Sequence, residues 1–325
     1  MISTSRRQNR AVTCLFAIAA IAASCAGQEP GISESRHIGH FEKAGEYMKD
    51  FFFLKAGDTY HLFYNVGKAS PNQNWLTPGN EDAFGHATSQ DLKTWVSHKR
   101  VMHVVPNSWE GQTVSAPSIL KVDDTYKMIY TGFSDKIHGN QTIGLAESKD
   151  LFHWERYENN PVYTGPSWTT WNAHGWADCR DSHIIQVDDR FLMYTTVRSK
   201  ENRGSVAIAR SSDLIHWEDL GPAFFVDVKN ERGDAKVPES PTVFDHNGKY
   251  YMIPSQGACY RSEDPAANNW KRMPFAWPQD GFWAGLEVVR EEDRYIAAAF
   301  VWKPNGNHIR FWELTFVDGR PVIQY

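Results

Sequence analysis

The sequence predicts an all-β protein built from repeated four-stranded units, and three observations lead to this prediction. No long stretch of the 325 residues shows the 3.6-residue hydrophobic period of an amphipathic helix. Short runs rich in Val, Ile, Tyr, Phe and Trp are instead separated by Gly, Asp and Asn turns, which is typical of strands and hairpins. One strand–turn–strand element also recurs five times along the chain.

The repeated element is an apolar strand, a tight polar turn and an aromatic-rich second strand. The first aromatic residue after each turn marks the register, and the marks are spaced by 66, 65, 59 and 45 residues. These five register marks are Tyr60, Tyr126, Phe191, Tyr250 and Tyr295.

A second motif lies between the copies of the first and reads Ser-x-Asp-Leu-x-x-Trp. Its copies end at Trp95, Trp154 and Trp217, with a degenerate form ending at Trp270. The pattern predicts a strand, a tight turn, and a tryptophan packed at the start of the next strand. Each unit then has four strands, and five units predict a five-bladed β-propeller, with a β-sandwich as the alternative. No linker composition interrupts residues 32–325, so we expect one domain there.

The composition excludes several classes of protein. With 41% apolar and 22% charged residues, the chain is not a disordered, collagenous or multispanning membrane protein. A formal charge of −5 without a basic stripe argues against nucleic acid as a partner. There is no His-Glu-x-x-His motif and no zinc-type cysteine spacing, so we predict no catalytic metal and no required cofactor. We expect a monomer.

Residues 1–25 are typical of a bacterial export signal. Three arginines precede an apolar run over residues 11–23, which ends in Ser24-Cys25-Ala26-Gly27. An N-terminal anchor helix is the alternative, and lipidation of Cys25 stays open as the one predicted link to a membrane. The protein is therefore expected in the periplasm, on the outer membrane as a lipoprotein, or secreted. Cys179 and Cys259 could pair there, although burial as free thiols is favoured.

The register marks also predict a site. Ten residues before the marks lie Asp50, Ala116, Asp181, Ser240 and Gly285, and Glu239 lies eleven before the fourth. The innermost strands of a propeller run side by side around its centre, so equivalent positions converge at one end. Asp50, Asp181 and Glu239 are thus expected to face one another, although turn-capping acids are the alternative for any single one.

Three converging carboxylates suit the cleavage of a glycosidic bond. One acid protonates the leaving oxygen, a second attacks the sugar or activates water, and a third stabilises or tunes the other two. Repulsion between like charges raises the pKa of one group, and this predicts the proton donor.

At these residues the sequence resembles the five-bladed propeller glycoside hydrolases of families 43 and 32, over almost the whole mature chain. The stretches at Asp50 and at Gly85-His86-Ala87-Thr88-Ser89 resemble family 32 most. The family 32 motifs Asn-Asp-Pro, Arg-Asp-Pro and Glu-Cys-Pro correspond here to Lys49-Asp50-Phe51, Arg180-Asp181-Ser182 and Glu239-Ser240-Pro241. The catalytic positions are kept while their neighbours differ.

The resemblance implies a role for each acid. Glu239 would be the general acid, and Asp181 would stabilise the transition state or orient Glu239. Asp50 would be the nucleophile in the family 32 scheme or the base in the family 43 scheme. A single domain is more typical of family 43, and this favours inversion with Asp50 as the base. Some family 43 propellers hold a structural calcium at the axis, which the resemblance allows here.

Several other residues are candidates for binding a sugar. Arg180 could donate hydrogen bonds to hydroxyl groups, with an ion pair to a neighbouring acid as the alternative. Trp176 and Trp283 are the tryptophans placed best to stack on a sugar ring, although packing is the usual role of any one of them. Glu287 and His174 are candidate rim groups.

The sequence thus predicts an exported glycoside hydrolase that acts on an oligo- or polysaccharide of furanosides or related plant or algal glycans. Fructofuranosides and arabinofuranosides or xylosides are the two main substrate classes. A non-catalytic carbohydrate-binding propeller is the alternative, and a propeller that binds proteins is a third hypothesis. The three acids argue against simple binding, which neutral groups would serve better.

Overall fold

The computed structural model describes residues 37–69, 77, 79–137, 139–175, 177–255, 257–278, 281–301 and 307–324. The predicted export segment with Cys25 lies outside these residues, and so does Trp176. The described part of the chain contains strands and no helix, as the sequence predicted. It accordingly holds no helix of the length and apolarity needed to cross a membrane.

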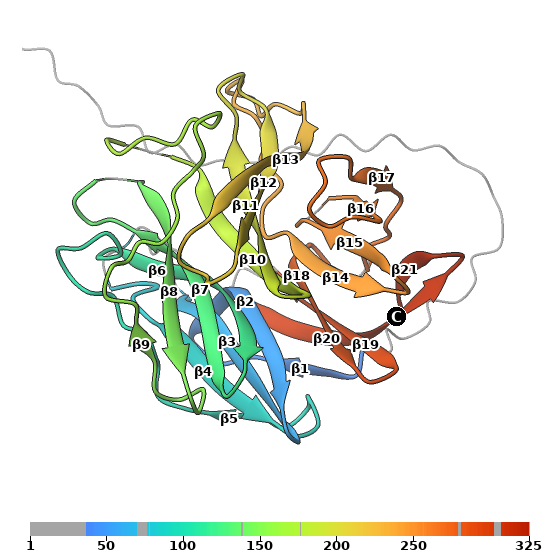
Figure 1. The fold of residues 1–325 in the computed structure, drawn as a ribbon. Helices are drawn as coiled ribbons and strands as arrows, with labels where there is room; N and C mark the ends of the chain where they lie inside the picture. The colour runs from blue at the N-terminus through green and yellow to red at the C-terminus, as the bar shows by residue number, and fades with distance from the viewer. Residues whose placement is uncertain are drawn as a thin grey trace, which may run out of the picture. The chain divides into compact units, whose positions relative to one another are not determined.

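Five antiparallel sheets, here called blades one to five, follow one another along the chain (Figure 1). Blade one consists of β2 (Glu46–Ala56), β3 (Thr59–Lys68), β4 (Phe84–Ser89) and β5 (Val96–Ser97). Blade two consists of β6 (Thr113–Val122), β7 (Thr125–Phe133), β8 (Gln141–Ser148) and β9 (Glu155–Arg156). Blade three consists of β10 (Cys179–Val187), β11 (Arg190–Arg198), β12 (Gly204–Ser211) and β13 (Glu218–Val226). Blade four consists of β14 (Thr242–His246), β15 (Lys249–Ile253), β16 (Cys259–Ser262) and β17 (Lys271–Met273).

Blade five is built from both ends of the described chain. Its strands β18 (Trp283–Glu291), β19 (Arg294–Val301) and β20 (His308–Val317) come from the last repeat. The outer edge of β20 is then shared by β1 (Gly39–Phe41), which pairs with residues 309–311, and β21 (Arg320–Ile323), which pairs with residues 314–317. The N-terminal strand therefore closes the ring, which the repeats did not predict because β1 belongs to no copy.

The first strands of the five blades form the centre of the fold. β2 contacts β6, β6 contacts β10, β10 contacts β14, β14 contacts β18, and β18 returns to β2. Four-stranded blades around a closed ring of inner strands are a five-bladed β-propeller. The predicted fold class is confirmed.

The hydrophobic core lies between neighbouring blades. Each of five buried clusters joins two blades, and the cluster between blades one and two, for example, packs Phe52 and Phe63 against Val114 and Met128. Blades one and five share a further cluster, as do blades two and three, three and four, and four and five. Cys179 and Cys259 are buried in two of these clusters as free thiols, as favoured from the sequence.

The Ser-x-Asp-Leu-x-x-Trp motif forms the same turn in three blades. In blade one, Ser89 Oγ accepts the backbone N–H of Leu92 at 2.9 Å, and Asp91 Oδ1 accepts that of Thr94 at 2.7 Å. Leu92 is buried with a φ of 61°, and Trp95 Nε1 donates to its carbonyl at 3.1 Å. Blades two and three repeat these contacts. The serine, aspartate, leucine and tryptophan of the motif therefore each make a contact that stabilises the turn.

A pair of buried histidines in blade one makes the stability depend on pH. His61 Nδ1 and His86 Nε2 lie 3.1 Å apart, and His86 stacks on Phe63 with 4.5 Å between ring centroids. Burial lowers the pKa of His61 to about 4 and that of His86 to about 3. A histidine in the unfolded chain titrates near pH 6.5. As the pH falls below this value, these two histidines therefore bind protons in the unfolded chain but stay neutral in the folded one.

We therefore expect the free energy of unfolding to be highest above about pH 6.5 and to fall as the pH is lowered towards 4. Each histidine should lower it by up to about 1.4 kcal/mol per pH unit. Urea unfolding at pH 7, 6 and 5 measures this loss. His86→Leu should flatten the dependence, while His103→Leu, at an exposed position, should leave it unchanged. Equal slopes in the wild type and in His86→Leu would contradict the assignment.

Candidate active site

A left-handed backbone residue at the same position of every repeat builds the site, and in four of the five blades it forms a bulge in the inner strand. The five positions ten residues before the register marks all have a left-handed backbone, with φ values of 41°, 47°, 53°, 48° and 60°. The strand pairing shifts at this point in blades one, two, three and five, while in blade four β14 starts just after it. The five residues are Asp50, Ala116, Asp181, Ser240 and Gly285.

The bulge decides which side chains reach the centre. Successive side chains of a regular strand point to opposite faces, but a bulge interrupts this alternation. The bulge residue and the residue before it can therefore both reach one cavity, as Lys49-Asp50, Arg180-Asp181 and Glu239-Ser240 do. In blade five the bulge residue is Gly285, where a Cβ would approach the ring of Phe300 to 2.7 Å.

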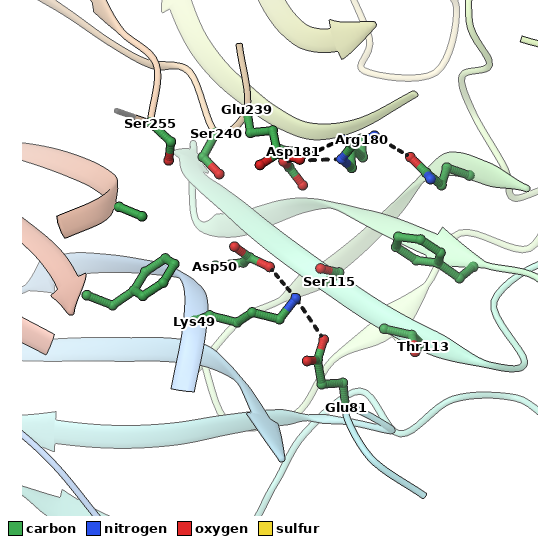
Figure 2. Close-up of a pocket in the computed structure, with 14 residues that line it drawn as sticks. Lys49, Asp50, Glu81, Thr113, Ser115, Arg180, Asp181, Glu239, Ser240 and Ser255 are labelled. Atoms are coloured by element: carbon green, nitrogen blue, oxygen red, sulfur yellow. Dashed lines mark hydrogen bonds and ion pairs between the residues drawn. The ribbon is translucent and has the colours of Figure 1, made fainter. Parts of the chain in front are cut away.

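A cavity of about 230 Å³ brings the three predicted acids together (Figure 2). Asp50, Asp181 and Glu239 come from blade one, blade three and the loop before β14. The cavity is lined by Lys49, Asp50, Glu81, Thr113, Ser115, Phe133, Gln141, Arg180, Asp181, Glu239, Ser240, Ser255, Ala284 and Phe300. It is smaller than the roughly 300–1,000 Å³ typical of pockets for drug-sized ligands, and its size suits a single sugar unit.

Asp50 is held through one of its two oxygens. Lys49 Nζ lies 3.0 Å from Asp50 Oδ2, and Asn65 Nδ2 donates to the same oxygen at 3.4 Å. Asn65 Nδ2 also lies 2.7 Å from Ser115 Oγ, and Asn65 Oδ1 accepts the N–H of Ala116 at 3.2 Å. Asn65 thus joins blade one to blade two through hydrogen bonds and also contacts Asp50.

Arg180 connects the acids of blade three with Glu239. Its Nη2 lies 2.6 Å from Glu239 Oε1, its Nε lies 3.7 Å from Asp181 Oδ2, and its Nη1 donates to Asp178 and, at 3.2 Å, to Gln141 Oε1. Asp178 is 2% exposed, so this network is largely withdrawn from water. The ion pair given above as the alternative for Arg180 is therefore present, although the residue also lines the cavity.

The pKa of Asp181 is raised in this cavity. Burial raises the pKa of Asp181 to about 7, the Arg180 cation opposes this shift, and the carboxylates of Asp50 and Glu239 add to it. The reason is location: the side chain of Asp181 is 8% exposed and that of Glu239 is 52% exposed.

Two polar groups in the cavity wall have no hydrogen-bond partner among the described residues. They are Gln141 Nε2 and Thr113 Oγ1, on fully buried side chains of blade two. A buried polar group without a partner costs free energy.

The other predicted sugar contacts lie elsewhere. Glu287 lines a second cavity of about 10 Å³, where its Oε2 lies 3.5 Å from His183 Nδ1. Trp283 is 3% exposed and packs edge-on against Trp312, because its strand runs through the core of blade five. His174 is exposed and does not line either cavity.

Sequence reasoning missed Lys49, Glu81 and Gln141. Lys49 precedes Asp50 by one residue, as Arg180 precedes Asp181, so the repeat register could have found Lys49 as well. Glu81 lies in the loop between β3 and β4, which has no counterpart in the repeat. Gln141 is the first residue of β8 and carries no motif.

The described residues include no cluster of three or more His, Cys, Asp or Glu side chains able to ligate a metal ion. A structural calcium at the axis, which the family 43 resemblance allows, stays a prediction. No step of the chemistry below passes through a metal.

The curated relatives of this chain include uncharacterized proteins, glycoside hydrolases, a fructosyltransferase and a 1,2-beta-oligomannan phosphorylase. A probable sucrose-6-phosphate hydrolase of Psychromonas ingrahamii is 27% identical over 209 residues, which are 62% of this chain and 34% of the relative. The chain spans less than two thirds of the length of the first curated relatives that it matches.

Solved structures agree in fold. A thermostable family-43 glycoside hydrolase superposes with a TM-score of 0.70 at 15% identity, over 90% of this chain and 96% of that one. A point mutant of the GH32 β-fructofuranosidase BmSUC1 of Bombyx mori, in complex with sucrose, superposes with a TM-score of 0.64 at 20% identity, over 89% of this chain and 65% of that one.

The family assignment follows from the sequence match. The model described as the glycosyl hydrolases family 32 N-terminal domain matches residues 40–250, which include Asp50, Asp181 and Glu239 and cover more than half of the chain. This chain therefore belongs to the glycosyl hydrolases family 32, through its N-terminal propeller domain.

Proposed function

We propose that this protein hydrolyses the glycosidic bonds of neutral furanosides, with fructofuranosides as the first substrate class to test. The observation that carries the proposal is one cavity lined by Asp50, Asp181 and Glu239 from three different blades. Membership of family 32 and the fructofuranosidase among the structural neighbours support the choice of fructofuranosides over arabinofuranosides or xylosides.

Asp50 is proposed as the nucleophile and Glu239 as the general acid and base. Asp50 attacks the anomeric carbon as the glycosidic C–O bond breaks, and Glu239 gives its proton to the leaving oxygen. Glu239 then takes a proton from a water molecule, which attacks the same carbon and releases the sugar and the Asp50 carboxylate. A substrate that covers the half-exposed Glu239 would bury it, and burial favours the protonated acid.

Asp181 is proposed to stabilise the reacting sugar. Protonated, it can donate a hydrogen bond to a sugar hydroxyl beside the anomeric carbon, and ionised, it can stabilise positive charge on the ring. Arg180 contacts both Asp181 and Glu239, so the same cation stabilises whichever of these two acids is ionised.

Retention of configuration is the proposed outcome. The sequence favoured inversion on the ground of a single domain, but the family 32 match supports the scheme in which Asp50 is the nucleophile. That scheme forms a covalent sugar–Asp50 intermediate and keeps the configuration of the anomeric carbon after two displacements.

The charge of the cavity predicts a preference for neutral sugars. Among the described residues, its walls carry the four acids Asp50, Glu81, Asp181 and Glu239 and two cations, and both cations are already paired with these acids. A phosphate group would add charge of the same sign.

We therefore expect sucrose, levan or inulin to be cleaved with a kcat/KM at least about tenfold above that for sucrose 6-phosphate, a difference of about 1.4 kcal/mol. A reducing-sugar assay that includes arabinan and xylan measures this and tests the function itself. Preference for the phosphorylated sugar would overturn the charge argument. Binding of fructans without any release of sugar would favour the carbohydrate-binding alternative.

We also propose that the protein is exported. The support is the arginine-rich start, the apolar run and the small residues up to Gly27. N-terminal sequencing of the protein from its host should find chains that begin between Cys25 and Gln28, and retention of Met1 would refute export.

A further inference from the structure

Lys49 and Glu81 form an ion pair inside the cavity, directly beside Asp50 (Figure 2). We propose that Lys49, held in place by Glu81, is a positioning residue that keeps the Asp50 carboxylate ionised and leaves its Oδ1 atom to react with the sugar. This inference rests on the proposed function, in which Asp50 is the reacting carboxylate.

The ammonium group of Lys49 contacts two carboxylates. Its Nζ lies 3.0 Å from Asp50 Oδ2 and 3.3 Å from Glu81 Oε2. The bulge at Asp50 makes this possible, because consecutive side chains of a regular strand would point to opposite faces. The side chains of Lys49 and Asp50 are each 16% exposed, so solvent screens the pair only weakly.

Glu81 is fixed independently of Asp50. Its Oε1 accepts the hydroxyl of Tyr47 at 2.6 Å, and its Oε2 accepts Asn65 Nδ2 at 3.1 Å. The side chain is 1% exposed and the backbone has a φ of 52°, an uncommon conformation for a glutamate. A buried carboxylate held this rigidly requires a cation, and Lys49 is the cation that it contacts.

Asp50 needs such a partner because acids surround it. The charged and titratable groups that face it are Tyr47, Lys49 and Glu81 of blade one, Arg180, Asp181 and His183 of blade three, Glu239 before β14, and Glu287 of blade five, which lines a second cavity with Asp50 and His183. Four of these carry carboxyl groups, and an ionised carboxylate nearby disfavours a second one. Arg180 already pairs with Asp178 and Glu239, which leaves Lys49 as the cation in contact with Asp50.

The geometry also separates the two oxygens of Asp50. Lys49 and Asn65 both bind Oδ2, and Oδ1 has no protein partner in the described part of the chain. An ion pair on the reacting oxygen would weaken it as a nucleophile, whereas one on the other oxygen fixes the plane of the carboxylate. Family 32 carries an asparagine at the position of Lys49, so this cation is a departure of the present chain from the motif.

The test is the titration of the Asp50 carboxyl carbon, followed by ¹³C NMR in protein labelled at aspartate and assigned with Asp50→Asn. Lys49→Met should raise the pKa of Asp50 by about one to three units, because a contacting cation is lost. Glu81→Gln should lower it, since Lys49 then has one acid instead of two. Lys49→Arg should restore most of the wild-type value.

Lys55→Met is the matched control, because Lys55 lies on the same strand and pairs with Glu291 at 3.6 Å, away from the cavity. It should leave Asp50 unchanged. An Asp50 midpoint that stays in place in Lys49→Met and does not fall in Glu81→Gln would overturn the proposal. If Lys49→Met does not fold, the downward shift in Glu81→Gln and the recovery in Lys49→Arg decide the question.

Kinetics separate this inference from the proposed function. The acidic limb of kcat/KM should move up in pH for Lys49→Met and down for Glu81→Gln, and a merely structural role would move neither. If the wild type cleaves no glycoside, the proposed function fails, while the NMR titration still tests the effect of Lys49 on Asp50.

Discussion

Replacing Asp50 by Asn or Glu239 by Gln is expected to lower turnover by at least about a hundredfold, because each change removes a group that moves a proton or attacks the sugar. Both substitutions keep the size of the side chain. Asn also tolerates the left-handed backbone at Asp50, where φ is 41°. The fold should be retained, since one charge is removed from a crowded set of acids.

The measurement is the initial rate of sugar release, with thermal unfolding as the check of folding. Asp123→Asn is the matched control: Asp123 is an exposed acid with a φ of 53° in the β6–β7 turn, so the same change is made on the same backbone outside the cavity. It should keep wild-type turnover. Near-normal rates in Asp50→Asn or Glu239→Gln would show that the chosen acids are not the reacting groups.

Arg180→Met is expected to cost about 3–5 kcal/mol of stability at pH 7, because it removes a buried cation that contacts three carboxyl groups. Asp178 is 2% exposed and cannot regain water, and Arg198, at 2.8 Å, would be its remaining partner. Sugar release should also fall, since Glu239 and Asp181 lose the group that links them.

Urea unfolding measures the stability of Arg180→Met against Arg210→Met. Arg210 pairs with Glu218 at 2.8 Å, but both side chains are largely exposed, so its loss should cost only about 0–1 kcal/mol. Similar losses in the two variants would mean that the network around Arg180 is open to water and contributes little.

The repeats predicted the blades and most of the site for a physical reason. Every blade of a propeller repeats the same strand–turn–strand pattern, so Asp50 and Asp181 could be aligned with Ser240 in the sequence. All three residues have a left-handed backbone in the structure. Glu239 stands one residue earlier, in a loop, and the structure shows that this residue lines the same cavity as Asp50 and Asp181.

Structural features that belong to no copy of the repeat could not be predicted from it. Glu81 reaches the cavity from a loop, and β1 closes the ring through pairing with β20, which depends on contacts far apart in the chain. The raised pKa of Asp181 could not be predicted either, because it depends on how deeply the side chain is buried, and the repeat pattern does not report burial. Trp283 was placed by sequence next to the site, yet its ring is used in the core of blade five.

The anomeric configuration of the first-formed product tests the central claim most directly. Proton NMR of a fructofuranoside or arabinofuranoside digest, recorded before mutarotation, reports it. Retention is the expected result, because Asp50 attacks the sugar itself and water attacks the covalent intermediate in a second displacement. Inversion would mean that Asp50 activates water instead, and it would contradict the assignment of Asp50 as the nucleophile.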